Sequence, residues 1–256
     1  MVSMPTLSVF ICAHNEAGQL AECLSALSFA HQRVVVLDRC TDASRAVALM
    51  HGAKLVEGAW EREGPRRQAG HDACAGDWIL EIDADERVSV ELAHEILDII
   101  QHDKGDFYRI RFNNYVGRRL VAYGWGAQLG VGAKICLYRK GCKSWGLQRV
   151  HPKVEVTGHN GGWLRHRITH FVDQNISDML HRLDRYTTLH AQDLVDSGDI
   201  GTLRRNAWRI LGRFYKCYVR RQGWREGGLG LLMAVCAGLY PLISHVKAKE
   251  LMQHEG

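Results

Sequence analysis

The sequence lacks the features of a secreted or disulfide-linked protein. Its 256 residues include eight cysteines, but no two of them form a C-x-x-C pair. The first residues, MVSMPTLSVFICAHNE, contain no basic segment ahead of an apolar run and lead directly into a strand-like pattern. We therefore expect reduced thiols in a cytosolic protein.

The sequence also contains no internal repeat and no low-complexity linker. With 46% apolar and 24% charged residues, its composition is that of an ordinary globular protein. The length suffices for one large domain, or for one domain with an appended subdomain.

Acidic residues are missing from one stretch near the C-terminus. Between Arg204 and Arg225 there are eight Arg or Lys and no Asp or Glu, although the whole chain has a net charge of only +5. Arg205, Arg209 and Arg213 recur every four residues, with apolar and aromatic residues between them. Such a basic amphipathic helix suits an anionic membrane surface. It also suits a helix that packs on the rest of the protein and leaves its basic face in water, and both interpretations stay open.

Charged residues of either sign are absent from residues 227–246, GGLGLLMAVCAGLYPLISHV. Twenty such residues are as long as a membrane span. Four Gly, one Pro and one His within the segment argue against a span. We expect a hydrophobic helix that is docked on the protein or lies at the membrane periphery.

The first half of the chain alternates between strand-like and helix-like patterns. The β-branched runs at 7–13 and 33–37, with further strands at 53–58 and 77–82, are separated by helical patterns such as 42–50 and 65–76. A helix at 89–100 follows, and Ser89 is its expected cap. This order predicts an α/β fold with a parallel sheet and helices on both faces. Strands at 106–116 and 134–141 come next, and the chain reads as helical from Ser177 onward.

Polar residues follow three of the predicted strands. These clusters are CAHNEA at 12–17, LDRCTD at 37–42 and DADE at 83–86. Ligands of parallel α/β sheets bind beyond the carboxyl ends of the strands. The three clusters therefore predict one site at that edge.

The Asp-x-Asp of Asp83 and Asp85 has two readings on its own. Such a pair after a buried strand can bind Mg²⁺ or Mn²⁺ through hard oxygen ligands. It can equally be a solvated turn in which an Asp caps a helix. A calcium loop is excluded, because no Gly or distal Glu follows at the required spacing.

Taken together, these segments resemble the family 2 glycosyltransferases. The segments that carry the resemblance occur in the order FICAHNEAGQLAECLSAL, VVVLDRCTDAS, PRRQAG and GDWILEIDADERVS, with QGWREGGLG near the C-terminus. The sequence is most similar to the bacterial lipopolysaccharide core β-glucosyltransferase type. The resemblance implies an α/β fold of the GT-A (Rossmann-like) type over residues 1–175, with a central mixed sheet flanked by helices. A helical region at 176–256 would pack on this catalytic domain close to the membrane.

The resemblance also implies a donor site for a nucleotide-sugar. Its first loop would consist of Ala13, His14, Asn15 and Glu16. In that loop the His14 ring would stack on a uracil base, and the backbone of Ala13 would read the edge of the base. The usual Ser-Gly-Ser ahead of the next Asp is Arg39-Cys40-Thr41 in this sequence, which leaves the geometry of that loop open.

Four further residues are assigned by the same comparison. Asp38 would contact the base, and Arg67 would lie near the diphosphate. Asp83 would face the ribose, and Asp85 would bind the Mg²⁺ or Mn²⁺ that bridges the two phosphates. A divalent ion and a basic residue neutralise the charge that develops on a diphosphate leaving group.

The general base of an inverting transfer is less defined. Relatives often have His-Glu after a strand that reads Arg-Leu-Phe, whereas this chain has CLY at 136–138 and Pro152 in place of the Glu. The candidates for the base are therefore His151 and Glu155. The missing Arg leaves Lys134 or Arg139 as a phosphate partner.

Several other polar residues have weaker assignments. Glu86 would hold its loop by pairing with Arg87 or another base. His159, His166 and His170 match no common zinc spacing, and we expect them at the polar surface or in an acceptor cleft.

The resemblance implies a specific reaction, against which two alternatives stand. An inverting, metal-dependent enzyme would move a hexose, glucose from UDP-glucose, onto a lipid-linked glycan such as the lipopolysaccharide inner core. It would lie in the cytoplasm, peripherally associated with the inner face of the bacterial cytoplasmic membrane, with no nucleic acid partner. The alternatives are a metal-dependent nuclease that uses the DADE acids and the basic helix, and a non-catalytic membrane-binding module.

Overall fold

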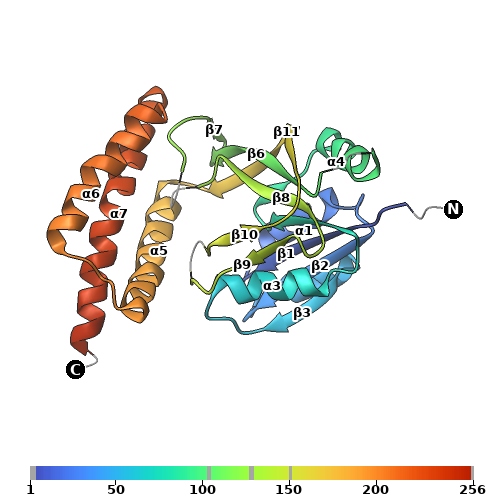
Figure 1. Ribbon diagram of the computed structural model, residues 1–256, viewed down its shortest axis with the longest axis horizontal. Coiled ribbons are helices and arrows are strands. Elements are labelled where there is room, and N and C mark those ends of the chain that lie inside the picture. The colour runs from blue at the N-terminus through green and yellow to red at the C-terminus, as the bar shows by residue number, and fades with distance from the viewer. Residues whose placement is uncertain (1–3, 103–104, 127–129, 150–151, 255–256) are drawn as a thin grey trace. The chain divides into compact units, whose positions relative to one another are not determined.

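A computed structural model describes residues 4–102, 105–126, 130–149 and 152–254 (Figure 1). The chain divides into two compact units. Unit 1 consists of Met1–Asn113, Ala133–Gln148 and Pro152–His170, and unit 2 of Asn114–Gly132, Arg149–His151 and Phe171–Gly256. Each unit thus comprises three separate segments of the chain. The boundary near residue 175 that the sequence predicts stays a prediction.

The first half of unit 1 alternates between strands and helices, as the sequence predicts. Its elements are β1 (Leu7–Ala13), α1 (Ala17–Ala26), β2 (Gln32–Asp38), α2 (Ser44–Met50), β3 (Lys54–Gly58), α3 (Glu63–Ala73) and β4 (Trp78–Asp83). The four strands are parallel and lie in the order β3-β2-β1-β4. Strands β1 and β4 are buried along almost their entire length, because both faces of a parallel sheet are covered.

The sheet continues beyond β4 with strands of mixed direction, in the order β8, β6, β11, β5. These strands are β8 (Ala133–Arg139), β6 (Phe107–Val116), β11 (Asn160–Asp173) and β5 (Glu86–Arg87). The β4–β8, β8–β6 and β11–β5 pairs are antiparallel, so the expected central mixed sheet is confirmed. Strands β9 (Lys143–Trp145) and β10 (Val154–Val156) form a separate pair.

Two local features hold helices of unit 1 in place. Gly70 of α3 allows a close approach to the sheet, since a Cβ there would lie 2.6 Å from Phe10 and 2.9 Å from Val36. Helix α4 (Val90–His102) follows Ser89, whose Oγ accepts a hydrogen bond from the Leu92 amide at 3.2 Å. Ser89 is therefore the cap that the sequence predicts.

Unit 2 is mainly helical, with α5 (Ile176–Ser197), α6 (Leu203–Tyr215) and α7 (Gly227–His254). A π-helical turn (Lys216–Arg220) and a short 3₁₀ helix (Gly223–Glu226) connect α6 to α7. Strand β7 (Arg119–Val121) pairs with the last residues of β6. The start of α5 is capped by Asn175 and that of α6 by Thr202, each through its side-chain oxygen.

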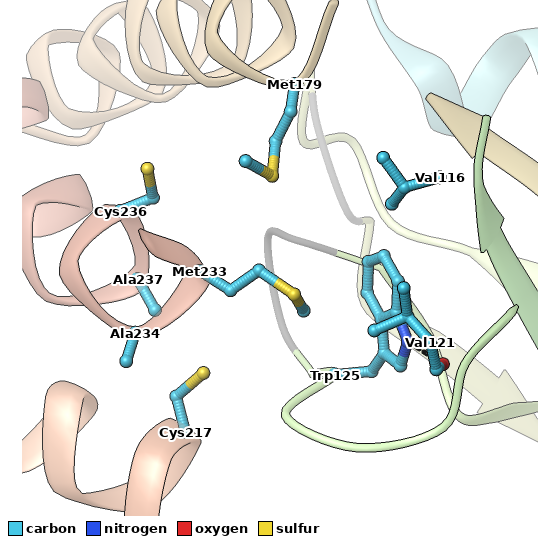
Figure 2. Packing of buried hydrophobic residues seen from close by; sticks show 9 residues of the cluster. All are labelled: Val116, Val121, Trp125, Met179, Cys217, Met233, Ala234, Cys236 and Ala237. Atoms are coloured by element: carbon cyan, nitrogen blue, oxygen red, sulfur yellow. Dashed lines mark hydrogen bonds between the residues drawn. The ribbon is translucent and has the colours of Figure 1, made fainter. Parts of the chain in front are cut away.

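The core of unit 2 lies where its helices meet the segment that follows β6. Met179 of α5 and Met233 of α7 point into the same space as Trp125 (Figure 2). The indole nitrogen of Trp125 donates to the carbonyl of Val121, which satisfies its one polar group. The other buried members of this cluster are Val116, Cys217, Ala234, Cys236 and Ala237.

The segment QGWREGGLG has a structural role in unit 2. The carboxylate of Glu226 accepts hydrogen bonds from the amides of Ala122 at 2.8 Å and Tyr123 at 3.0 Å, and it pairs with Arg119 at 2.9 Å. Glu226 is buried, so these three donors compensate its desolvation. They tie the start of α7 to the β7 segment.

Helix α7 contains the uncharged stretch of the sequence. By length and composition, the helical stretch Gly223–Gln253 passes as a membrane span, and its most apolar window of 18 residues has a mean hydropathy of 1.8. More than half of the most apolar window is buried within the fold, however, and α7 packs against both α5 and α6. The helix therefore serves as the core of unit 2, in line with the docked helix that we expect from the sequence.

All eight cysteines are free thiols, as the sequence predicts. Burial raises the pKa of Cys12 to about 12 and that of Cys217 to about 11. Thiols of such high pKa are poor nucleophiles at neutral pH.

The Met233 side chain is expected to contribute strongly to the stability of unit 2. Met233→Ala should lower the free energy of unfolding by about 2–5 kcal/mol, because it leaves a cavity next to Trp125. Met252 on the same helix is exposed, so Met252→Ala is the matched control and should change stability little. Urea titration followed by far-UV circular dichroism measures both. Equal effects of the two substitutions would contradict the assignment of Met233 to the core.

Candidate active site

The strand registers bring the three polar clusters to one edge of the sheet. Cys12 on β1 lies opposite Asp83 on β4, and Ala13 lies opposite Leu37 on β2. The carboxyl ends of β1, β2 and β4 therefore coincide. This confirms the common edge that we predicted from the strand–helix alternation.

The loop after β1 is held by the loop after β2. Asn15 has a left-handed backbone (φ 57°), and its Oδ1 accepts from the amides of Thr41 at 2.8 Å and Asp42 at 3.2 Å. The amide of Glu16 donates to Ser44 Oγ at 3.0 Å. Asn15 and Glu16 thus fix the backbone of the predicted nucleotide loop.

His14 is exposed at the tip of this loop. Its Nδ1 lies 2.6 Å from the carbonyl oxygen of Asp38, a contact that orients the imidazole ring. The neighbouring Ala13 is buried as the last residue of β1. The loop therefore presents a ring of fixed orientation above the edge of the sheet.

Asp38 is buried at the end of β2, within a shell of donors. Arg39 contacts both carboxylate oxygens, at 2.9 and 3.1 Å, and the amide of Trp60 donates at 3.1 Å. Arg66 adds a contact at 3.3 Å. Burial alone would raise the pKa of Asp38, but these hydrogen bonds and charges lower it below its usual value. In the segment Arg39-Cys40-Thr41, which stands in place of the usual Ser-Gly-Ser, Arg39 thus supplies a cation that pairs with Asp38.

Arg67 of α3 lies in the centre of a buried charge network. Its guanidinium pairs with Glu63, with Glu81, and with Asp83 Oδ1 at 3.1 Å. Glu81, in the middle of β4, also pairs with the buried Nζ of Lys143. Each buried carboxylate therefore has a cationic partner, as desolvation demands.

Asp83 has a cation at each of its two oxygens. Lys134 Nζ lies 2.9 Å from Asp83 Oδ2, opposite the Arg67 contact at Oδ1. Burial would raise the pKa of Asp83, but Arg67 and Lys134 hold it well below its usual range. The same Lys134 lies 2.8 Å from Glu86 Oε1.

Glu86 is fully buried, and its role differs from that of Asp83. Its Oε2 accepts from the Asp83 amide at 3.0 Å, which closes the DADE turn. Burial raises the pKa of Glu86 to about 7, despite the opposing charge of Lys134. Its basic partner is thus Lys134. Arg87 instead donates to backbone carbonyls and to Glu22.

Asp85 lies next to His170, a residue that sequence reasoning did not assign to the site. The antiparallel β11–β5 pair aligns His170 with Glu86, and His170 Nε2 lies 3.3 Å from Asp85 Oδ2. Burial would lower the pKa of His170, but its hydrogen bond to Asp85 and the charge of Asp85 raise it. The alternation of RHRITHF places His170 on the buried face of its strand, but only the tertiary pairing selects its neighbour.

The donor atoms at this point suit a divalent cation. Within the described part of the chain, Asp85, Glu86 and His170 form the group whose ligand atoms all lie within 4.8 Å of one another. Two carboxylates and an imidazole suit Mn²⁺, and carboxylate oxygens suit Mg²⁺. The residues present therefore fit the expected metal.

His151 is not among the described residues. Glu155 is exposed on β10, with Lys153 at 3.2 Å. Arg139 is wrong as a phosphate partner, because it lies opposite Trp78 at the start of β4, away from Asp83. His166 pairs with Glu95 of α4.

The pKa shifts of Glu86 and His170 predict a pH-dependent stability. Both values are raised in the folded protein, so their contributions are complete below the unfolded values and are lost as pH rises through the folded ones. The free energy of unfolding should therefore fall between about pH 5 and about pH 8, a range in which the low pKa of Asp83 has no effect.

The Glu86→Gln protein should show a smaller fall over this range, because it lacks the group that titrates near pH 7. Urea titrations at both pH values measure the difference. Glu57→Gln, at an exposed position on β3, is the control and should keep the full fall. An undiminished fall in Glu86→Gln would show that Glu86 is not the titrating group.

The chain is similar to known glycosyltransferases. Residues 8–131 match the model of Glycosyl transferase family 2. The chain is 24% identical over 255 residues to the lipopolysaccharide core biosynthesis glycosyltransferase LpsC of Rhizobium meliloti, which covers 96% of this chain and 93% of that protein. An uncharacterized glycosyltransferase of Rickettsia typhi is 25% identical over 261 residues, covering 97% of this chain and 88% of that protein.

Among solved structures, glucosyl-3-phosphoglycerate synthase from Mycobacterium tuberculosis, in complex with Mn²⁺, uridine-diphosphate and glucosyl-3-phosphoglycerate, aligns with a TM-score of 0.38 and 20% identity. The alignment covers 44% of this chain and 46% of that enzyme, so this chain spans less than half of its length. The match to this family accords with the mixed sheet flanked by helices that the structure shows. Residues 8–131 therefore carry a family 2 glycosyltransferase domain, and the chain is a glycosyltransferase.

Proposed function

We propose that this glycosyltransferase is an inverting, metal-dependent enzyme that moves a hexose, glucose from UDP-glucose, onto a lipid-linked glycan. The observation that carries the proposal is the single edge that holds Asp38, Asp83 and Asp85 in a family 2 domain. Similarity to LpsC over nearly the whole chain supports an acceptor of the lipopolysaccharide inner core. Such an acceptor lies at the inner face of the cytoplasmic membrane, so the enzyme works from the cytoplasm at an anionic membrane surface.

In this proposal the donor binds across the edge. The exposed His14 ring stacks on uracil, and the backbone of Ala13 reads the edge of the base. Asp38 contacts the base as an ionised carboxylate, which its low pKa supports. Arg39 and Arg66 hold that carboxylate in one orientation.

The diphosphate meets the charges at the end of β4. Asp83 contacts the ribose. Arg67 pairs with this carboxylate and provides positive charge near the diphosphate. Asp85, with Glu86 and His170, holds Mg²⁺ or Mn²⁺. The bound ion neutralises the charge of the leaving diphosphate.

The acceptor hydroxyl loses its proton to a general base, for which Glu155 and His151 are the candidates. Glu155 is exposed, and its partner Lys153 is exposed as well. An exposed base on the β9–β10 pair is accessible to a large acceptor.

The charge pattern argues against the nuclease alternative. A two-metal nuclease needs carboxylates that are free to bridge two ions. Both oxygens of Asp83 contact cations of the protein, Arg67 and Lys134, which leaves one centre at Asp85 among the described residues. A non-catalytic module is excluded because the chain is a glycosyltransferase.

Calorimetry with UDP and Mn²⁺ tests the metal site. Asp85→Asn and His170→Ala should each weaken metal-dependent UDP binding by roughly 10–100-fold. Asp98→Asn is a matched control, because Asp98 also pairs with a histidine, His102 at 3.1 Å, but on the exposed face of α4. It should bind as the wild type does. Absence of UDP binding to the wild type in either metal would overturn the proposal.

Measurement of nucleotide release with several nucleotide-sugars and a lipid-linked acceptor tests the reaction. UDP-glucose should give the fastest release. Glu155→Gln should lower kcat by about 10²–10⁴-fold if Glu155 is the base, and leave UDP binding unchanged. An unchanged kcat would show that Glu155 is not the general base, and His151→Ala would then be the next variant to measure.

A further inference from the structure

Helix α6 presents apolar side chains to solvent. Trp208, Leu211, Tyr215 and, in the following turn, Val219 are 65%, 63%, 59% and 44% exposed. Their spacing of three and four residues aligns them in one stripe along the helix. A helix that packs on a globular core normally turns its polar face to water. An apolar stripe that faces water is the reverse of this usual arrangement.

The opposite face of α6 defines how the helix is held. Asn206 and Cys217 are buried, and Asn206 donates to the carbonyl of Ile200 at 3.3 Å. The guanidinium of Arg213 lies over the Tyr240 ring of α7, 5.5 Å from its centroid. Ile210 lies against Gly238, at whose position a Cβ would be 3.1 Å from the Ile210 carbonyl oxygen. Because α7 takes this inner face, the apolar stripe points away from the core of unit 2.

Cations border the stripe, and the segment that forms it contains no acidic residue. From Gly201 to Arg225 the sequence has no Asp or Glu. Arg204, Lys216 and Arg220 are exposed beside the stripe. Arg205 is also exposed, but it lies 3.1 Å from Asp199. The surface thus combines an apolar centre with a positive margin.

We propose that this surface, defined by Trp208, Leu211, Tyr215 and Val219 with Arg204, Lys216 and Arg220, lies in the plane of an anionic lipid bilayer and inserts its apolar stripe into the headgroup region. A bilayer offers apolar and anionic layers in parallel, which matches the stripe and its margin. Nucleic acid would need cations at the centre of the surface, where Trp208 and Leu211 lie. The tryptophan and tyrosine rings suit the lipid–water interface.

This inference deepens the proposed function, since a docked α6 keeps the enzyme at the layer that contains a lipid-linked acceptor. It assigns membrane contact to α6 and leaves α7 within the fold. Binding to lipid can be measured without sugar transfer, so the two proposals fail separately.

The test is co-flotation of the whole chain with phosphatidylglycerol–phosphatidylcholine vesicles, compared with pure phosphatidylcholine vesicles. The triple variant Trp208→Ser, Leu211→Ser, Tyr215→Ser should lose at least about tenfold in affinity for anionic vesicles. The variant Arg204→Gln, Lys216→Gln, Arg220→Gln should lose the preference for anionic lipid and its salt dependence. Arg213 is left unchanged because it packs on Tyr240.

The matched control is Leu49→Ser, Met50→Ser, which removes two exposed apolar side chains of α2 in unit 1. It should float as the wild type does. Circular dichroism and UDP–Mn²⁺ calorimetry on every variant separate loss of membrane contact from loss of folding or of the donor site. Wild-type flotation by the triple variant, no flotation of the wild type, or preferential binding to nucleic acid would each overturn the proposal.

Discussion

The edge of the sheet depends on the two cations that hold Asp83. Arg67 from α3 and Lys134 from β8 each take one oxygen of this carboxylate, and both reach a second acid, Glu81 or Glu86. Without these cations, three carboxylates in and after a buried strand would repel one another and lose their hydration. The ion pairs therefore permit an acidic turn at the end of β4, and they connect a helix and an antiparallel strand to the parallel half of the sheet.

One consequence is that the acids after β4 have different environments. Asp83 is ionised and paired, whereas Glu86 is buried with a raised pKa and closes the turn through the Asp83 amide. Asp85 points to His170 instead of a permanent cation. In our proposed function Asp85 is a ligand of the metal ion, together with Glu86 and His170.

Unit 2 is organised by the burial of α7. Its apolar side chains pack with Trp125 and Met179, and Glu226 fixes its start. Because α7 occupies the inner face of α6, the aromatic and aliphatic residues of α6 remain on the surface among arginines. Helix α7 has the length and composition of a membrane span, but it is the buried support of α6. Helix α6 in turn has an exposed surface that suits contact with a membrane.

The sequence by itself determined the parallel half of the sheet and its polar edge. Strand and helix periods are local, and the clusters after β1, β2 and β4 follow from them, so His14, Asp38, Asp83 and Asp85 could be placed on one edge. Only the tertiary structure decided which residues share that edge from far along the chain. Lys134 and His170 lie at this edge because their strands pair in antiparallel fashion, and no local pattern specifies the register of such pairs. The same limit applies to α6, since its period reveals an amphipathic helix, but only packing against α7 decides which face meets solvent.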